Sequence, residues 1–309
     1  MSRIKGVDEN RPVRLGRRLA RADRIARGRG VAPTVYPFPG RRAATRGLAL
    51  LTVIVAGLGA LALAVSAPPS GAKTSHVRPT VVLVHGAFAD ASSWSGVIVR
   101  LLRDGYRVIA PANPLRGLAY DAAYVASVLK TVKGPVVLVG HSYAGAVIGQ
   151  AAADLPNVKA LVFVDGFALD TGESITSAGA AFTNDLLGSA LLERRFPLPD
   201  GQTATDVYVQ PSRYHAVMGA DLPEATTALL AATQRPIALS AFDEKATAAA
   251  WKTIPSVFVI GRQDRAIDPA ELLFMAHRAH GRVVELQASH LGLISHVGAV
   301  AKVIEQAAR

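Results

Sequence analysis

The stretch VVLVGHSYAG, residues 136–145, places one serine between a run of β-branched residues and a run of small ones. Residues 135–140 predict a strand that is buried on both faces, and residues 143–155 predict a helix rich in small side chains. Ser142 lies where the strand turns into the helix, which is the context of a G-x-S-x-G nucleophile elbow. The stretch therefore predicts an α/β unit with a candidate nucleophile at its turn.

The elbow crowds the positions two before and two after the serine, so both must be small. They are Gly140 and Ala144 in this chain, and Ala144 departs from the second glycine of the pattern. A serine in front of a helix can also act as an N-cap. The motif alone leaves both interpretations of Ser142 open, because a nucleophilic serine also needs a base and an orienting acid.

Strands and helices alternate along the rest of the chain. Apolar runs predict strands at 80–85, 106–111, 135–140, 159–166, 253–261 and 281–287. Helical spacing predicts helices at 92–105, 120–132, 143–155, 269–281 and 296–308. This alternation predicts the α/β class, with a mostly parallel sheet of about six strands and helices on both faces.

Residues 169–250 break the alternation between the fourth and fifth strands. They contain polar loops, such as residues 198–207, and helical pieces, such as residues 221–234. Ligands of open α/β sheets bind outside the carboxyl ends of the strands. We therefore expect residues 169–250 to form a helical lid over a site at this edge.

A candidate acid and a candidate base follow the last two strands. Asp264 comes directly after the fifth strand and His290 directly after the sixth, so both lie at the same sheet edge as Ser142. The order Ser, Asp, His is that of a triad in this type of fold. Asp165, at the end of the fourth strand, remains an alternative acid. For the oxyanion hole we expect backbone N–H groups of Tyr143 and of Ala87.

The remaining titratable residues are weaker candidates. Asp268 precedes Pro269 and has the position of a helix cap. We expect surface, capping, linker or structural roles for five other histidines, although His215 in the insertion can also line a pocket. These residues are His76, His215, His277, His280 and His296. No group of histidines and carboxylates has metal-ligand spacing, so we expect neither a metal nor a cofactor.

The net charge of +11 belongs to the N-terminal part of the chain. Residues 1–46 contain 13 Lys and Arg against 3 Asp and Glu, and the other residues contain 21 against 20. A nucleic-acid-binding domain carries its basic surface on the fold, so this distribution argues against such a partner. The chain has no cysteine, which excludes disulfides, thiolate metal sites and a cysteine nucleophile.

Residues 47–67 have no charged side chain, and a helix of this length spans about 30 Å. They predict either the apolar region of a signal peptide, ending near Ala67, or an uncleaved transmembrane anchor. Either interpretation predicts export, with the following domain secreted or membrane-anchored. The remaining boundaries are a basic, disordered region at 1–46, a linker at 68–78 and the folded domain at 79–309.

Four motifs together resemble α/β-hydrolase-fold serine esterases, and especially the branch that contains methyl-ester esterases and hydroxynitrile lyases. The motifs are VVLVHGAFADASSW (81–94), GHSYAG (140–145), GRQDRAIDP (261–269) and ASHLGLISH (288–296). The resemblance covers about residues 79–308. It implies a triad of Ser142, Asp264 and His290, an oxyanion hole at Ala87 and Tyr143, and a structural tryptophan at Trp94.

Two positions separate the subgroups of this branch. The lyases carry a lysine after the catalytic histidine and lack the glycine of the first motif, whereas this chain has Leu291 and Gly86. The resemblance therefore implies a cofactor-free serine hydrolase that cleaves a small carboxylic ester. A catalytically silent ligand-binding module, a lyase and a cofactor-free haloperoxidase remain alternatives, and the oligomeric state is open.

Overall fold

The computed structural model of the protein describes residues 78–309. The predictions for the basic region 1–46, the apolar segment 47–67, the linker up to residue 77 and His76 lie outside the described residues. Of the helices within residues 78–309, none has both the length and the apolar character needed to span a membrane.

Six parallel strands form the central sheet, in the order β2-β1-β3-β4-β8-β9. Their bounds are β1 Thr80–Val84, β2 Arg107–Ile109, β3 Val136–His141, β4 Val158–Val164, β8 Ser256–Gly261 and β9 Arg282–Leu286. The central strands β1 and β3 are buried along their whole length, whereas the edge strands β2 and β9 are partly exposed. Continuous apolar runs are typical of parallel strands covered on both faces. The predicted α/β class and parallel six-stranded sheet are confirmed.

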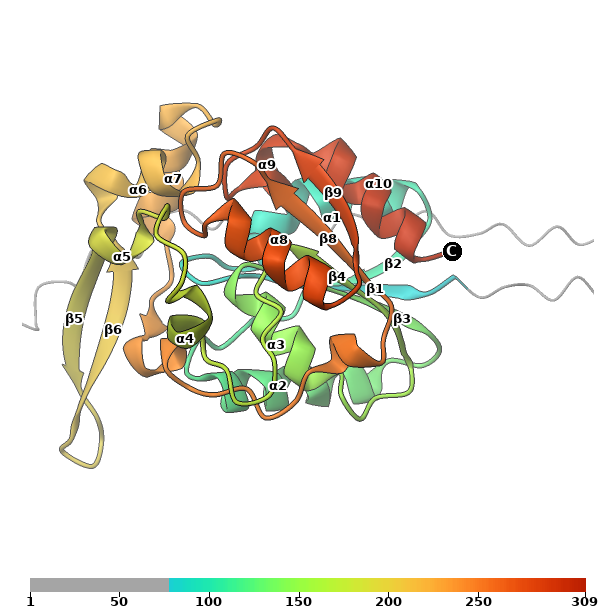
Figure 1. Cartoon of the computed structure of the whole chain (residues 1–309), viewed down its shortest axis with the longest axis horizontal. Helices are drawn as coiled ribbons and strands as arrows, with labels where there is room; N and C mark the ends of the chain where they lie inside the picture. Colours follow the sequence, from blue (N-terminus) through green and yellow to red (C-terminus); the bar gives the residue numbers. More distant parts are fainter. Residues whose placement is uncertain (1–77) are drawn as a thin grey trace, which may run out of the picture. The chain divides into compact units, whose positions relative to one another are not determined.

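Helices cover both faces of this sheet (Figure 1). On one face α1 (Ser95–Arg103) packs against α10 (Val297–Ala307), and on the other α2 (Leu118–Thr131) packs against α3 (Tyr143–Ala151). The helix α8 (Pro269–Arg278) packs along β8 and β9. Two short helical segments, η1 (Ala91–Trp94) and α9 (Gly292–Ser295), precede α1 and α10 in the chain. These helices cover the two faces of the sheet and leave the carboxyl ends of its strands uncovered.

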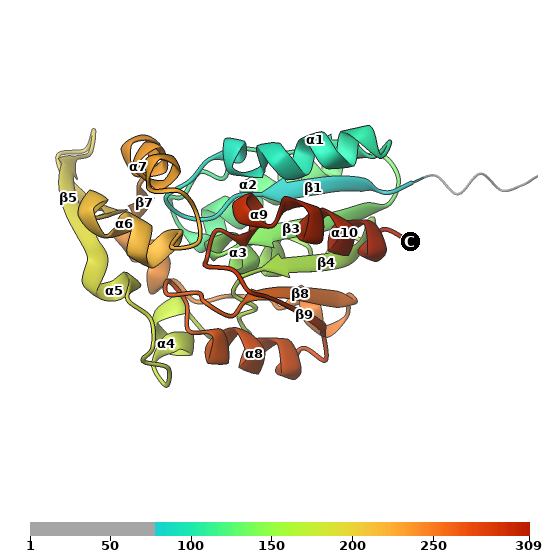
Figure 2. The same cartoon turned by 90° about the horizontal axis from the view of Figure 1, so that it is seen from above.

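The chain between β4 and β8 forms a separate group of elements, most of which lie beyond the carboxyl ends of the strands (Figure 2). The helices are α4 Ile175–Gly179, α5 Leu187–Ala190, α6 Pro211–Met218 and α7 Glu224–Thr233, with 3-10 turns η2 Leu239–Phe242 and η3 Ala250–Lys252. An antiparallel sheet of β5 Leu191–Pro197, β6 Thr203–Val209 and β7 Ile237–Ala238 lies among them.

This second sheet is the main difference from the sequence prediction. Residues 198–207, which were predicted as a polar loop, contain the turn between β5 and β6 and most of β6. Gly201 has φ 83° in that turn, a conformation that favours glycine. A strand with one buried face is predicted from strict alternation of apolar and polar residues. Most side chains of β5 are exposed or half-buried, so the hairpin lacks this alternation.

Candidate active site

Ser142 occupies a strained turn between β3 and α3. Its backbone has φ 55° and ψ −126°, a region that non-glycine residues adopt only when the surrounding structure enforces it. The turn is held by three hydrogen bonds: the N–H of Ser142 donates to Val164 O at 3.1 Å, and its C=O accepts from Gly145 N and Phe167 N at 2.9 and 3.2 Å. In the described chain its side chain makes no N-cap hydrogen bond, which argues against the capping interpretation.

Two glycines make the turn sterically possible. A Cβ on Gly140 would lie 2.5 Å from Ala144 O, and a Cβ on Gly145 would lie 2.6 Å from both N and O of Phe167. Ala144 is fully buried and its methyl group is accommodated. The position that excludes a side chain on the helix side is therefore Gly145 rather than Ala144, which explains why the departure from the motif is tolerated.

The structure brings Ser142, His290 and Asp264 into one hydrogen-bonded chain. His290 Nε2 lies 2.9 Å from Ser142 Oγ, and His290 Nδ1 lies 2.7 Å from Asp264 Oδ2. The side chains of His290 and Asp264 are 1% and 0% exposed. Burial lowers the pKa of His290 to about 3, so its imidazole is neutral at neutral pH and can accept a proton.

The other oxygen of Asp264 has its own partners. Oδ1 accepts hydrogen bonds from the N–H groups of Ala266, at 2.7 Å, and of Ile267, at 3.0 Å. Burial raises the pKa of Asp264, and these two hydrogen bonds act in the opposite direction by favouring the carboxylate. The turn after β8 thus fixes the carboxyl group so that Oδ2 points at the imidazole.

Asp165, the alternative acid, lies at the end of β4 and bonds elsewhere. Its backbone has φ 44°, and its Oδ1 accepts from the N–H of Gly261 at 2.6 Å. Complete burial and the charge of Asp264 raise the pKa of Asp165 well above its ordinary value. Of the two candidate acids, Asp264 is the one hydrogen-bonded to His290.

His141, to which the sequence motifs assign no role, contacts the backbone of His290 and lies beside its ring. Its Nε2 lies 3.0 Å from the backbone O of His290, and the two rings are 4.8 Å apart. Trp94 meets the ring of His141 edge-on at 6.4 Å. Burial holds the pKa of His141 well below its ordinary value, so the neutral ring donates from Nε2. The G-x-S-x-G pattern accepts any residue at the position of His141, so the motif gives no signal for its role.

Both predicted oxyanion-hole residues, Ala87 and Tyr143, line the same cavity as Ser142 and His290. Tyr143 is the first residue of α3, where a backbone N–H has no partner inside the helix. A Cβ on Gly86 would lie 2.8 Å from Ser142 Cβ. The loop after β1 therefore packs directly against the nucleophile turn because residue 86 is glycine.

The cavity has a volume of about 410 Å³, which is in the range of small-molecule sites. Apart from residues next to the triad, its apolar walls come mainly from the segment between β4 and β8. These wall residues are Phe167, Ile175, Leu187, Leu191, Met218, Leu239 and Phe242. The geometry combines a serine hydroxyl, a neutral imidazole and a carboxyl group with a mostly apolar cavity.

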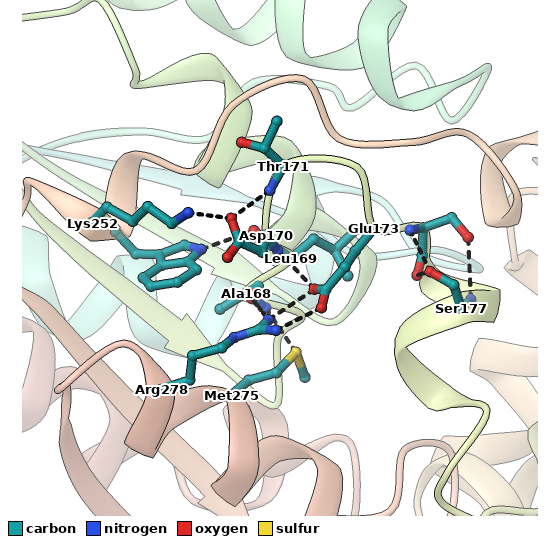
Figure 3. Close-up of polar contacts among 11 residues, drawn as sticks. Ala168, Leu169, Asp170, Thr171, Glu173, Ser177, Lys252, Met275 and Arg278 are labelled. Carbon is teal, nitrogen blue, oxygen red and sulfur yellow. Dashed lines mark hydrogen bonds and ion pairs between the residues drawn. The ribbon is translucent and has the colours of Figure 1, made fainter.

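One wall of the cavity is tied to the central fold by a half-buried ion pair (Figure 3). Glu173 accepts two hydrogen bonds from the guanidinium of Arg278 in α8, at 2.6 and 2.8 Å. Arg278 also donates to Ala168 O at 2.9 Å. Immediately after Glu173, Ser174 and Ser177 form a capping box that begins α4. The position of α4 against the cavity thus depends on Arg278.

The weaker candidates lie away from the triad. Asp268 caps α8, with Oδ1 accepting from Ala270 N at 2.9 Å, as predicted. His215 on α6 contacts Thr227 Oγ1 at 3.1 Å and does not line the cavity. His277 and His280 are exposed, and His296 precedes α10 beside Ser295. Within residues 78–309 no three His, Asp or Glu side chains are grouped so as to hold a metal ion.

Comparison with known proteins extends these observations. The model of the alpha/beta hydrolase family matches residues 81–303. Alpha/beta hydrolase nvfD of Aspergillus novofumigatus is 26% identical over 253 residues, which are 75% of this chain and 97% of that protein. A carbendazim-hydrolysing esterase of Nocardioides sp. is 32% identical over 107 residues, which are 30% of this chain and 44% of that protein.

The fold is also shared with solved structures. The crystal structure of polyneuridine aldehyde esterase has a TM-score of 0.66 at 18% identity, over 74% of this chain and 99% of that one. At this identity the likeness concerns the fold. The family match covers most of the described residues and includes β3, the elbow and the turns after β8 and β9. The chain therefore belongs to the alpha/beta hydrolase family, as its four motifs predicted.

Proposed function

We propose that the protein is a serine esterase that cleaves a small carboxylic ester through a Ser142-His290-Asp264 triad. The observation that carries the proposal is the pair of distances at His290, 2.9 Å to Ser142 Oγ and 2.7 Å to Asp264 Oδ2, inside a single cavity. The carbendazim-hydrolysing and polyneuridine aldehyde proteins to which the chain is similar are both named as esterases.

Acylation begins with proton transfer. As Ser142 Oγ attacks the carbonyl carbon of the ester, its proton passes to Nε2 of His290. Asp264 stabilises the resulting imidazolium through Nδ1. The negative charge that develops on the carbonyl oxygen is received by the N–H groups of Ala87 and Tyr143, each worth on the order of 3 kcal/mol in sites of this kind.

Collapse of this intermediate expels the alcohol, which takes the proton from His290. The acyl group is then bound to Ser142. Water enters, gives a proton to His290 and attacks the acyl carbon; the proton then returns to Ser142 Oγ as the carboxylic acid leaves. Because His290 is neutral at the start of each half-reaction, it can act as the base in both.

The test is hydrolysis of a series of para-nitrophenyl esters of increasing acyl length by the purified protein. We expect turnover of short esters and a loss of at least about 10³-fold in Ser142→Ala. A fluorophosphonate probe should label the wild type at Ser142 and leave that variant unlabelled. Undiminished turnover in Ser142→Ala would refute the proposal.

The same assay separates the alternatives. A silent ligand-binding module would neither hydrolyse the esters nor react with the fluorophosphonate. A lyase or a haloperoxidase would react with the probe, and only the identity of the products distinguishes it from an esterase. Release of one acid and one alcohol per turnover is the result expected here.

A further inference from the structure

One part of the mostly apolar cavity carries acidic side chains. Glu271 of α8, Asp185 before α5 and Asp243 after η2 all line it together with Ser142. Among the lining residues that the structure describes there is no Lys or Arg. The proposed hydrolysis of an ester uses none of these carboxyl groups. Their presence therefore needs a separate explanation.

Glu271 is the most unusual of the three because it is buried without a partner. The residue is 5% exposed, and within the described chain its Oε1 is buried with no hydrogen-bond partner. A Cβ on Gly179 would lie 3.5 Å from its Oε2, so α4 lies close over the carboxyl group, next to α8 (Figure 2). A buried polar group with no partner costs about 1 to 3 kcal/mol.

Helix α8 supplies no hydrogen-bond partner for Oε1 of this carboxyl group. Glu271 lies in the first turn of α8, where an acidic side chain is favourable. The capping hydrogen bond there is made by Asp268, whose Oδ1 accepts from Ala270 N. The unpartnered oxygen of Glu271 is thus available to a ligand in the cavity.

The surroundings of Glu271 favour positive charge. Burial raises its pKa to about 8, and the nearby carboxyl groups of Asp185, Asp268, Asp264 and Glu173 add to this effect. The part of this rise that comes from the neighbouring carboxyl groups reflects a negative potential at Glu271. A cation on a bound ligand can take the place of that proton.

We propose that Glu271, with Asp185 nearby, forms a subsite for a positively charged group, so that the substrate is an ester that also carries a protonated amine. That the substrate is an ester rests on the proposed esterase function. That it carries an amine rests on the cavity alone. On binding, Glu271 releases its proton to solvent and its carboxylate accepts a hydrogen bond from the ammonium group. The apolar walls then contact the hydrocarbon between the amine and the carbonyl.

Binding can be measured without any turnover, by isothermal titration of the wild-type protein with pentylamine and with 1-pentanol near neutral pH. We expect the ammonium compound to bind at least about tenfold more tightly. Titration in two buffers of different ionisation enthalpy should show that a proton is released on amine binding. Equal affinity for the alcohol, or amine binding without proton release, would overturn the subsite.

Two variants assign the effect to one carboxyl group. Glu271→Gln should lose the preference for the amine. Glu224→Gln makes the same change in the first turn of α7, at an exposed residue outside the cavity, and should keep it. A preference that survives in Glu271→Gln would contradict the proposal. If that variant does not fold, proton release by the wild type still decides the question.

A second measurement links the subsite to hydrolysis. The para-nitrophenyl ester of γ-dimethylaminobutyrate is compared with the neutral analogue in which CH replaces the nitrogen. We expect kcat/KM to favour the amine ester in wild type and in Glu224→Gln, and the two esters to be equal in Glu271→Gln. Amine binding with no hydrolysis of either ester would contradict the esterase function and leave the subsite standing. Hydrolysis with no amine preference would contradict only the subsite.

Discussion

Asp165 and Asp264 end neighbouring strands, are both buried, and bond to different partners. Asp165 accepts from the backbone of Gly261 at 2.6 Å, and Asp264 contacts His290 Nδ1 at 2.7 Å. A position at the end of a strand is therefore insufficient to identify the acid of a triad. The turn through Ala266 and Ile267, which holds Asp264, makes the difference.

The first prediction compares the two acids. Asp264→Asn should lower kcat by about 10⁴-fold, because an amide facing Nδ1 favours the wrong histidine tautomer. Asp165→Asn should change kcat less than about tenfold, because Asp165 bonds to the backbone of Gly261 rather than to His290, and an amide oxygen can still accept from that N–H group. Ester hydrolysis by the two purified variants is the measurement. The reverse order of effects would assign the acid to Asp165.

The second prediction concerns the elbow. Gly145→Ala should destabilise the protein by about 3 kcal/mol or more, because its Cβ would lie 2.6 Å from backbone atoms of Phe167. Ala144→Gly, which restores the glycine of the motif, should cost only about 1 kcal/mol as a glycine in a helix. Thermal or chemical unfolding checks both values. Equal stability of the two variants would contradict this account.

The third prediction is a pH dependence of stability that arises from Glu271. Its pKa is raised from 4.5 to about 8, so the folded state binds this proton more tightly than the unfolded state. The contribution is fully present below about pH 4.5 and is lost as the pH rises through about 8, by at most about 5 kcal/mol.

Unfolding of the wild type and of Glu271→Gln over that range of pH measures this contribution. The difference in unfolding free energy between the two proteins should shift in favour of the variant as pH rises. Glu224→Gln, at its exposed position, should follow the wild type. Parallel curves for wild type and Glu271→Gln would show that the carboxyl group titrates normally.

The fourth prediction concerns the ion pair under α4. Arg278→Met removes both hydrogen bonds to Glu173 and should raise KM several-fold while kcat changes less than about twofold. The reason is that α4 lines the cavity, whereas the triad has no contact with this pair. Arg262→Met, which breaks the exposed pair with Glu285, is the control and should leave KM unchanged. A large fall in kcat alone would contradict this assignment.

The sequence was most informative where burial is continuous and where motifs follow strands. The strands around Val136–His141 are buried on both faces, so their apolar runs identified both the sheet and the edge at which Ser142, Asp264 and His290 lie. The hairpin of β5 and β6 is mostly half-buried or exposed, which leaves no such pattern. His141 escaped prediction because its contact with His290 joins residues far apart in the chain. The burial of Glu271 could not be predicted either, because it depends on the approach of α4 to α8.

The division of the cavity between two parts of the chain has an evolutionary consequence. The residues of the proposed triad follow strands of the central sheet, whereas most apolar walls belong to the single segment between β4 and β8. Mutations in that segment change which molecules fit the cavity and leave Ser142, Asp264 and His290 in place. Selection can therefore diversify the substrate range of such a protein while its chemistry is inherited unchanged.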